Sequence, residues 1–192
     1  MHTKQDYLML ELNDVVVEGA EKTVSMMARE RRMTCITGAT PSVRSRLLLA
    51  MMALEPVRNG IVSMDGEPLE QQTVALFRQM MAYVPAALKA DGEVVVYEPP
   101  TVQDVFGLKA NREAPISNGL LAEEMKRTGA LSDEKARLLA VAVLRQRPIL
   151  LVEEPDGASA DYLHRLAADG RMVIVTSTDS LILSKADEVV EI

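Results

Sequence analysis

The C-terminal part of the chain alternates short apolar runs with runs of helix formers, and this alternation restricts the fold more than any other feature. Pro148 introduces an apolar run at 149–152, helix formers fill 160–169, a second apolar run covers 172–176, and a short strand is expected at 188–192. Short buried strands that alternate with helices are typical of a parallel sheet covered by helices. The sequence therefore predicts an α/β fold with a largely parallel, doubly wound sheet.

The N-terminal part extends this pattern. Residues 8–18 alternate as a strand, residues 33–37 form a short apolar strand that ends at Gly38, and good helix formers fill residues 44–54 before Pro56. Proline disfavours the helical conformation of the residue before it, so the helix is expected to stop there. This region predicts the order strand, loop, helix.

A β hairpin is expected next along the chain. Residues 60–64 and 66–69 flank the pair Asp65-Gly66, which favours a tight turn because glycine tolerates positive φ. A further strand is expected over 80–84. The fold class is therefore a mostly parallel sheet with an antiparallel hairpin part.

The chain of 192 residues fits one domain with a modest inserted lobe. The least regular region runs from 86 to 120 and holds several prolines, and a helix that begins after Ser132 is expected through Arg145. We expect a single domain whose core comprises about 1–85 and 146–192. A shortened helical subdomain is expected at about 86–145.

Composition excludes several classes of function. A net charge of −7 argues against broad binding of nucleic acid, which depends on Lys and Arg that neutralise phosphates. No run approaches the roughly 18 apolar residues of a spanning helix, so no direct membrane insertion is expected. The first residues lack the pattern of a secretory signal, and Cys35 has no second cysteine to pair with. A cytoplasmic location is expected.

Five segments, taken in order, resemble the ABC-ATPase family. They read ITGATPSVRSRLLLAMMALEPVRNGIVSMDGEPL, MMAYVPA, TVQDVF, LSDEKARLLAVAVLRQRPILLVEEP and VIVTS. The match extends from about Leu8 to Ile192, and its strength lies in the order and spacing of the segments. It implies a P-loop NTPase-like fold and binding of ATP and Mg²⁺. It also implies a second ATPase-like subunit, in a homo- or heterodimer, and a membrane permease that holds the protein at the inner face of the membrane.

The phosphate loop departs from the family's pattern G-x-x-x-x-G-K-S/T. The loop reads GATPSVRS, so Pro41 and Val43 replace two glycines and Arg44 replaces the lysine. Proline has no N–H for a phosphate, and valine resists the positive φ that glycine adopts cheaply. A planar guanidinium also differs from a compact ammonium. By position, the resemblance implies phosphate contacts at Gly38, Ser42, Arg44, Ser45 and Arg46.

Two acids end the apolar strand LLVEE. The resemblance implies that Glu153, with Ser45, faces Mg²⁺ and that Glu154 is the catalytic base. Two acids at the C-terminal end of a parallel strand face the crevice where ligands usually bind. The alternative is that both carboxylates are simply solvated at the strand end.

The other motifs depart further from the family. Asp133 and Glu134 replace small residues of the signature sequence LSGGQ, and they would set carboxylates beside a polyanion. Ala86 stands at the position of the glutamine that senses Mg²⁺, and Ser177 at that of the switch histidine. The aromatic residue that stacks on adenine, expected near Glu18, is missing. Neither Ala86 nor Ser177 can perform the chemistry of the residue it replaces.

Three hypotheses follow. The first is a degenerate ABC ATPase, a pseudo-ATPase that acts as a binding or regulatory module; it explains why the apolar skeleton matches while the ligand-facing positions do not. The second is an ATP-binding transporter subunit that works only with a partner subunit carrying the consensus motifs. The third is another phosphate-binding or purely structural protein with the same sheet. The sequence favours the first.

Overall fold

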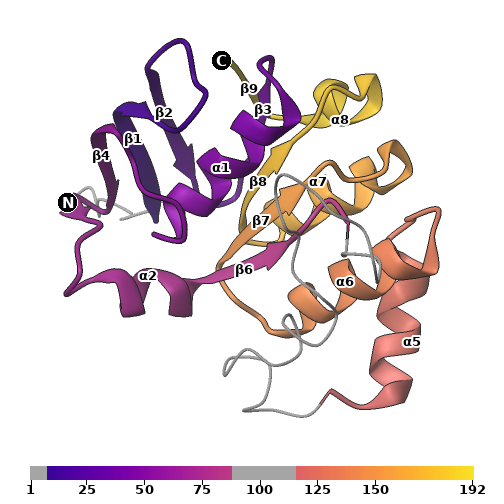
Figure 1. Cartoon of the computed structure of the whole chain (residues 1–192). Coiled ribbons are helices and arrows are strands. Elements are labelled where there is room, and N and C mark those ends of the chain that lie inside the picture. The colour runs from indigo at the N-terminus through magenta and orange to yellow at the C-terminus, as the bar shows by residue number, and fades with distance from the viewer. Residues whose placement is uncertain (1–7, 88–115) are drawn as a thin grey trace, which may run out of the picture.

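The computed structural model describes residues 8–87 and 116–192, and within these ranges the chain builds two sheets and the helices that cover them (Figure 1). The five-stranded sheet has the order β6-β7-β8-β3-β9, and all of its neighbouring strands are parallel. Its strands are β3 (Met33–Thr37), β6 (Met81–Val84), β7 (Ile149–Glu153), β8 (Met172–Thr176) and β9 (Glu188–Glu191). The predicted parallel sheet is confirmed.

The second sheet is antiparallel and has the order β2-β1-β4-β5. Its strands are β1 (Met9–Val16), β2 (Val24–Arg29), β4 (Asn59–Met64) and β5 (Glu67–Pro68). Asp65 and Gly66 have φ values of 51° and 83°, as the tight turn between β4 and β5 requires. The predicted hairpin is confirmed, whereas β2 was not foreseen, because VSMMAR has little β-branched character and is held by its pairing with β1.

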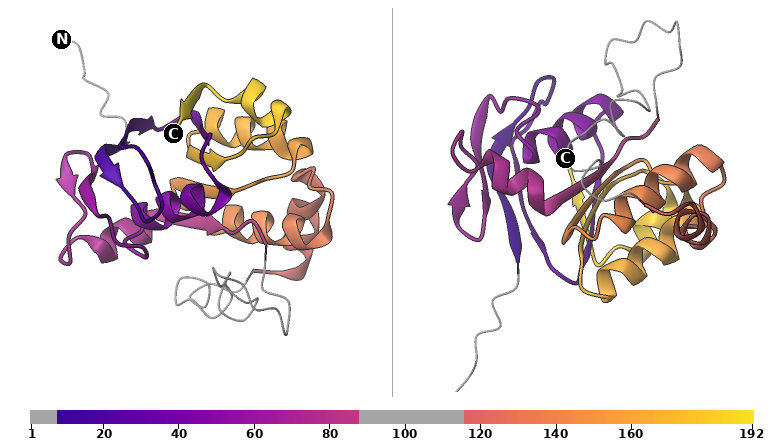
Figure 2. Two further views of the ribbon diagram at one scale, coloured as in Figure 1. Left: turned by 45° about the horizontal axis from the view of Figure 1, so that its top comes forward. Right: turned by 90° about the horizontal axis from the view of Figure 1, so that it is seen from below.

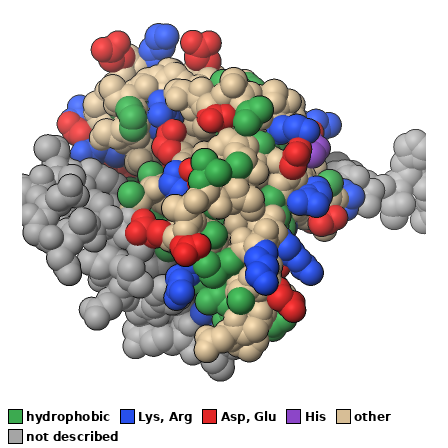
Figure 3. Space-filling model, turned by 90° about the vertical axis from the view of Figure 1, so that its right-hand side faces the viewer, with side chains coloured by type: hydrophobic (Ala, Val, Ile, Leu, Met, Phe, Trp, Pro, Cys, Tyr) green, Lys and Arg blue, Asp and Glu red, His purple; other side chains and the backbone are tan. Residues whose placement is uncertain are grey.

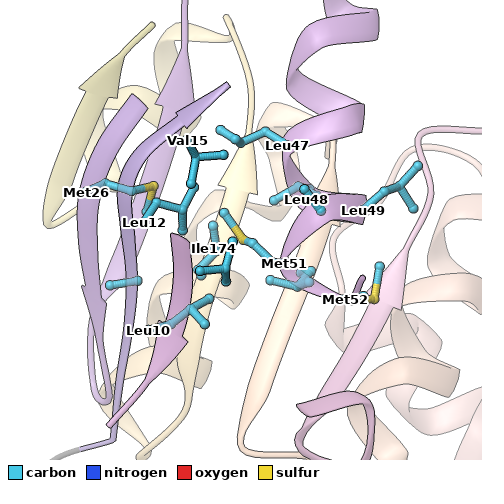
Figure 4. Close-up of a cluster of buried hydrophobic side chains, with 14 of the residues drawn as sticks. Leu10, Leu12, Val15, Met26, Leu47, Leu48, Leu49, Met51, Met52 and Ile174 are labelled. Carbon is cyan, nitrogen blue, oxygen red and sulfur yellow. The ribbon is translucent and has the colours of Figure 1, made fainter. Parts of the chain in front are cut away.

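Helix α1 (Pro41–Met51) lies between the two sheets (Figure 2). Leu47, Leu48 and Met51 pack among the side chains of both sheets, including Leu12 and Ile174 (Figure 4). The C-terminal part of α1, from Leu47 to Met51, is apolar on every side and is buried on every side. This single element therefore joins the antiparallel sheet to one face of the parallel sheet.

The helix predicted over 44–54 begins earlier than expected. Thr40 caps it, because the Val43 N–H donates to Thr40 Oγ1 at 3.4 Å, and Pro41 occupies the first helical position. Proline suits that position because its missing N–H has no partner there in any case. The helix also ends earlier, since Ala53 has a φ of 52°.

The other face of the parallel sheet is covered by α6 (Asp133–Leu144), α7 (Ala160–Ala168) and α8 (Ser180–Lys185). The predicted start of α6 is confirmed, because Ser132 Oγ accepts from the Lys135 N–H at 3.2 Å. Two further helices, α2 (Val74–Met80) and α5 (Asn118–Arg127), were not foreseen, and neither was α8. A short 3-10 turn, η1 (Gly157–Ser159), precedes α7.

The segment TVQDVF at 101–106 and most of the irregular region lie outside the described residues. Helix α5 contacts α6, and we call these two helices the helical lobe. In the part of the chain that the structure describes, no helix combines the length and the apolar character needed to cross a membrane.

Candidate functional site

The candidate site lies where β3 and β7 end and α1 begins. Gly38 follows β3 with a φ of 78°, and a Cβ at this position would come within 2.6 Å of the Ile192 carbonyl oxygen. Only glycine fits this turn without a backbone shift. Ala39 also has a positive φ, of 41°, so the loop bends sharply before Thr40 caps α1. The loop that would hold phosphate is thus formed as a tight turn onto a helix N-terminus.

Arg44 folds back onto this loop. Its side chain is only 4% exposed, and its Nη1 atom donates to the Gly38 oxygen at 2.7 Å and to the Ala39 oxygen at 3.0 Å. The guanidinium therefore fills the inside of its own turn. The sequence predicted a phosphate contact for Arg44 but not these carbonyl partners.

The same guanidinium binds the carboxylate of Glu154. Arg44 Nη2 and Nε donate to Glu154 Oε1 at 2.6 and 2.8 Å. Arg44 is buried while the Glu154 side chain is 30% exposed, so Glu154 is the member of the pair that reaches the solvent. The residue at the phosphate-binding position and the residue at the catalytic position are paired with each other.

Glu153 lies deeper and is 3% exposed. The Tyr83 hydroxyl donates to its Oε1 atom at 2.5 Å, the Ala86 N–H donates to its Oε2 atom at 3.2 Å, and the Ser45 hydroxyl is a third partner. Burial raises the pKa of the Glu153 carboxyl, and these hydrogen bonds offset only part of that rise. Tyr83 was missed from the sequence; the signal was a hydroxyl in the strand MAYV beside β7.

The signature-position segment contacts the end of β7. Asp133 and Glu134 are exposed at the N-terminus of α6, where their charge complements the helix dipole. Lys135 instead turns inward, and its Nζ atom donates to Asp156 Oδ1 at 2.9 Å and to the Glu154 carbonyl oxygen at 3.2 Å. Asp156 Oδ2 also accepts from the Leu131 N–H at 2.8 Å. Lys135 and Asp156 were not singled out by sequence.

Ser177, at the switch-histidine position, is 1% exposed. Its N–H donates to the Ile36 oxygen at 3.1 Å, and its Oγ atom accepts from the Asp179 N–H at 3.0 Å. The hydroxyl thus holds its own loop in place before α8.

The structure brings together Gly38, Arg44, Ser45, Glu153 and Glu154. Arg46 does not join them, because its guanidinium forms an ion pair with Glu55 beyond the C-terminal end of α1. Ser42 is exposed on the first turn of α1. Among residues 8–87 and 116–192, no three His, Cys, Asp or Glu side chains are grouped so as to hold a metal ion.

A pocket of ≈ 300 Å³ opens beside the start of α1. It is lined by the turn between β1 and β2, the first residue of β2, the loop and first turn of α1, and the residue that follows β9: Gly19, Ala20, Glu21, Lys22, Val24, Ala39, Thr40, Val43 and Ile192. None of these lining residues is aromatic, so the pocket offers no ring on which a nucleobase would stack.

The arrangement does not fit a Mg²⁺–ATP complex held in the family's manner. The cation at the lysine position already binds two loop carbonyls and a carboxylate, and Pro41 provides no N–H. The Glu153 carboxylate already accepts from Tyr83, Ala86 and Ser45. A nucleotide or a metal ion held in that manner would compete with these contacts.

Comparisons with known proteins point to one class. No protein-family model matches this sequence. The chain is 27% identical over 106 residues to the arabinose import ATP-binding protein AraG of Pectobacterium atrosepticum, covering 55% of this chain and 20% of that protein. It is 25% identical over 175 residues to an ATP-dependent lipid A-core flippase of Xanthomonas campestris pv. campestris, covering 84% and 30%. The chain thus spans about a fifth to a third of the length of these relatives.

Solved structures share the fold at low sequence identity. A bacterial Atm1-family ABC exporter with ATP bound has a TM-score of 0.72 at 13% identity, over 97% of this chain and 37% of that one. The structure of cbiO1 from Clostridium perfringens, part of the ABC transporter complex cbiONQ, has a TM-score of 0.64 at 17% identity, over 95% and 83%. A dimeric bacterial ABC transporter cassette has a TM-score of 0.64 at 17% identity, over 95% and 94%.

The fold is therefore that of ABC transporter ATPase cassettes, a mixed α/β P-loop NTPase-like fold with one parallel and one antiparallel sheet. Together with the sequence relatives, it confirms the predicted resemblance to the ABC-ATPase family. In sequence and in fold, this chain is similar to the nucleotide-binding domains of ABC transporters.

Proposed function

We propose that this protein is a pseudo-ATPase, a binding or regulatory module in which an internal ion pair takes the place of nucleotide contacts. The observation that carries the proposal is the buried guanidinium of Arg44, which is shared between the Gly38 and Ala39 oxygens and Glu154. Further support comes from five positions at which the family's nucleotide-contacting residue is replaced by another type: Pro41, Val43, Ala86, Asp133 and Ser177.

Energetics favour the closed pair over a bound phosphate. A hydrogen bond to a charged group contributes about 1.5–3 kcal/mol, and Arg44 would have to surrender several such bonds to reach a ligand. Its release would also leave Glu154 beside an incoming polyanion, which like charges oppose. Phosphate binding at this loop therefore costs free energy, because Arg44 must first give up its present hydrogen bonds. A lysine at this position that made no such bonds would not carry this cost.

The surface supports a role in protein contacts. On the face that carries the helical lobe, basic and acidic side chains are interspersed and hydrophobic side chains gather in its lower part (Figure 3). Leu131, in the signature-position segment, is 83% exposed, and Leu120 on α5 is 56% exposed.

We expect a partner protein, either a membrane permease or a second ATPase-like subunit, and a cytoplasmic location at the inner face of the membrane. The subdomain boundaries at about 86 and 145 remain a prediction.

One observation favours the alternative of a partner-dependent ATPase. Ser45 and Glu153, the two positions that would face Mg²⁺, lie within hydrogen-bond distance of each other, so their oxygen atoms are close enough to bind one cation if their mutual contact opened. In that case the site would bind ATP only in complex with a second subunit that carries the consensus motifs, and with a permease.

The test is calorimetric titration of the purified protein with ATP, with and without Mg²⁺, together with thermal unfolding. A ligand that binds the native state raises its apparent stability. We expect no heat of binding and no thermal shift at millimolar ATP. Micromolar, Mg²⁺-dependent binding would support the partner-dependent ATPase instead. Sustained turnover by the protein alone, abolished by Glu154→Gln, would overturn the proposal.

A further inference from the structure

Glu154 is held by three separate elements. Its φ of 40° is unusual for a residue with a side chain, and such strain persists only where the surroundings impose it. Its N–H donates to the Thr176 oxygen at 2.9 Å, at the end of β8. Its carboxylate is held by Arg44 of α1, and its carbonyl oxygen by Lys135 of α6. The turn at Glu154 is therefore fixed from the sheet, from the phosphate loop and from the helical lobe.

The lobe's contact with this turn is made at more than one point. Lys135 also pairs with Asp156, whose carboxylate accepts from the Leu131 N–H, so both ends of the segment 131–135 reach the same side chain. Nearby, a Cβ on Gly129 would come within 2.5 Å of the Ala158 oxygen. The segments 129–135 and 154–158 are thus in close contact along their length.

Lys135 is central to this contact because it bridges a backbone oxygen and a carboxylate. Its side chain is 33% exposed and that of Asp156 is 15% exposed, so water screens the pair only in part. The charge-assisted bonds of an ammonium are stronger than those of a neutral donor. Glu154 therefore accepts a hydrogen bond from Lys135 at its carbonyl oxygen and from Arg44 at its carboxylate.

We infer that Lys135 is a positioning residue that couples the helical lobe to the phosphate loop through the left-handed turn at Glu154. A displacement of the α6 N-terminus withdraws the donor from the Glu154 carbonyl, relaxes the turn and alters the grip of Glu154 on Arg44. By linkage, release of Arg44 loosens the lobe in turn. The inference concerns the chain without a ligand, so it stands whether or not ATP binds.

Hydrogen exchange in Lys135→Met tests the coupling, because methionine keeps most of the volume and removes the charged donor. We expect the backbone amides at 38–45 and 154–157, other than Pro41 and Pro155, which have no N–H, to exchange at least about tenfold faster than in the unmodified protein, because loss of one charge-assisted bond corresponds to at least that factor. Amides of β1 and β2, on the far side of α1, should keep their rates. Lys135→Arg should restore protection, and Lys126→Met, on the exposed side of α5, is the matched control.

Two results would overturn the inference. One is faster exchange confined to α5 and α6 with unchanged rates at 38–45, which would make Lys135 a local tether only. The other is uniformly faster exchange in every element, β1 and β2 included, which would report a loss of global stability. If Lys135→Met does not fold, Asp156→Asn removes the negative charge that pairs with Lys135 at nearly constant shape. Exchange confined to α5 and α6, or uniformly faster exchange, in that variant would overturn the inference in the same way.

Discussion

Arg44 Nη2 lies 2.6 Å from Glu154 Oε1, although the two residues are 110 positions apart in the sequence. By the resemblance to the ABC-ATPase family, Arg44 stands at the position of the phosphate-binding lysine and Glu154 at that of the catalytic base. Here the two side chains neutralise each other. The pairing accounts for how the buried arginine is tolerated at this position, because a buried charge requires a partner.

Removing the carboxylate should destabilise the protein. Glu154→Ala leaves the Arg44 guanidinium buried without its counter-charge, and we expect the free energy of unfolding to fall by about 1–3 kcal/mol, less than for a fully buried pair because Glu154 is partly exposed. Urea unfolding at neutral pH measures the change. Glu18→Ala, which breaks the exposed pair between Glu18 and Arg58, should leave the midpoint unchanged. Equal effects of the two substitutions would contradict the assigned role.

Restoring the family pattern should restore nucleotide binding. The triple variant Pro41→Gly, Val43→Gly, Arg44→Lys converts GATPSVRS into GATGSGKS, which regains a loop N–H, glycine freedom and a compact ammonium. Thermal unfolding should then shift upward with millimolar Mg²⁺–ATP. Two glycines in the first turn of α1 cost about 1–2 kcal/mol, so the variant's own midpoint is recorded first. Pro41→Gly alone is the control and should show no shift; a folded triple variant without a shift would refute the prediction.

Acid should weaken the contact between Lys135 and Asp156. Burial by itself raises the pKa of the Asp156 carboxyl, but the bonds from Lys135 and the Leu131 N–H lower the pKa by more. A carboxyl whose pKa is lowered on folding stabilises the protein above its unfolded pKa of about 3.9, and this contribution fades as the pH falls below that value. The stability gap between the natural protein and Asp156→Asn should therefore shrink between neutral pH and pH about 3. A gap that grows in acid would refute the assignment.

Cys35 should be unreactive in the folded protein. It is fully buried in β3, and burial raises the pKa of its thiol to about 11. Because the thiolate is the reactive form, a chromogenic disulfide reagent at mildly alkaline pH should not label the native chain. In denaturing urea the same reagent should label one thiol per chain. Rapid labelling without denaturant would show that this region of the sheet opens locally.

Gly129 and Gly119 should respond in opposite ways to alanine. Gly129 has a φ of 71° and faces the Ala158 oxygen, so Gly129→Ala should lower the free energy of unfolding by about 1–3 kcal/mol. Gly119 lies in α5 with no atom within 4 Å of its missing Cβ. Gly119→Ala should therefore raise helix stability by about 0.5–1 kcal/mol. Paired urea titrations measure both, and a neutral Gly129→Ala would mean that the lobe moves away at little cost.

Several elements escaped prediction for a common reason. β2, α2, α5 and α8 have weak local patterns, and no residue of α5 is buried. Such segments take their conformation from a neighbour: β2 from its pairing with β1, and α2 from Arg78, whose side chain donates to the carbonyl oxygens at Met52 and Ala53. Their sequences alone do not favour one structure over another.

The sequence by itself determined the parallel strands, the turn at Asp65-Gly66, the Ser132 cap and the positions of the motif remnants. Apolar runs, turn residues and caps act over a few residues, so a single chain displays them directly. Only the tertiary structure decided that Arg44 pairs with Glu154, Tyr83 with Glu153 and Lys135 with Asp156, across 110, 70 and 21 positions. Those partners meet because the ends of the parallel strands, α1 and the N-terminus of α6 converge at one edge of the sheet. The direction of a long polar side chain at that edge depends on which acceptors the fold places within its reach.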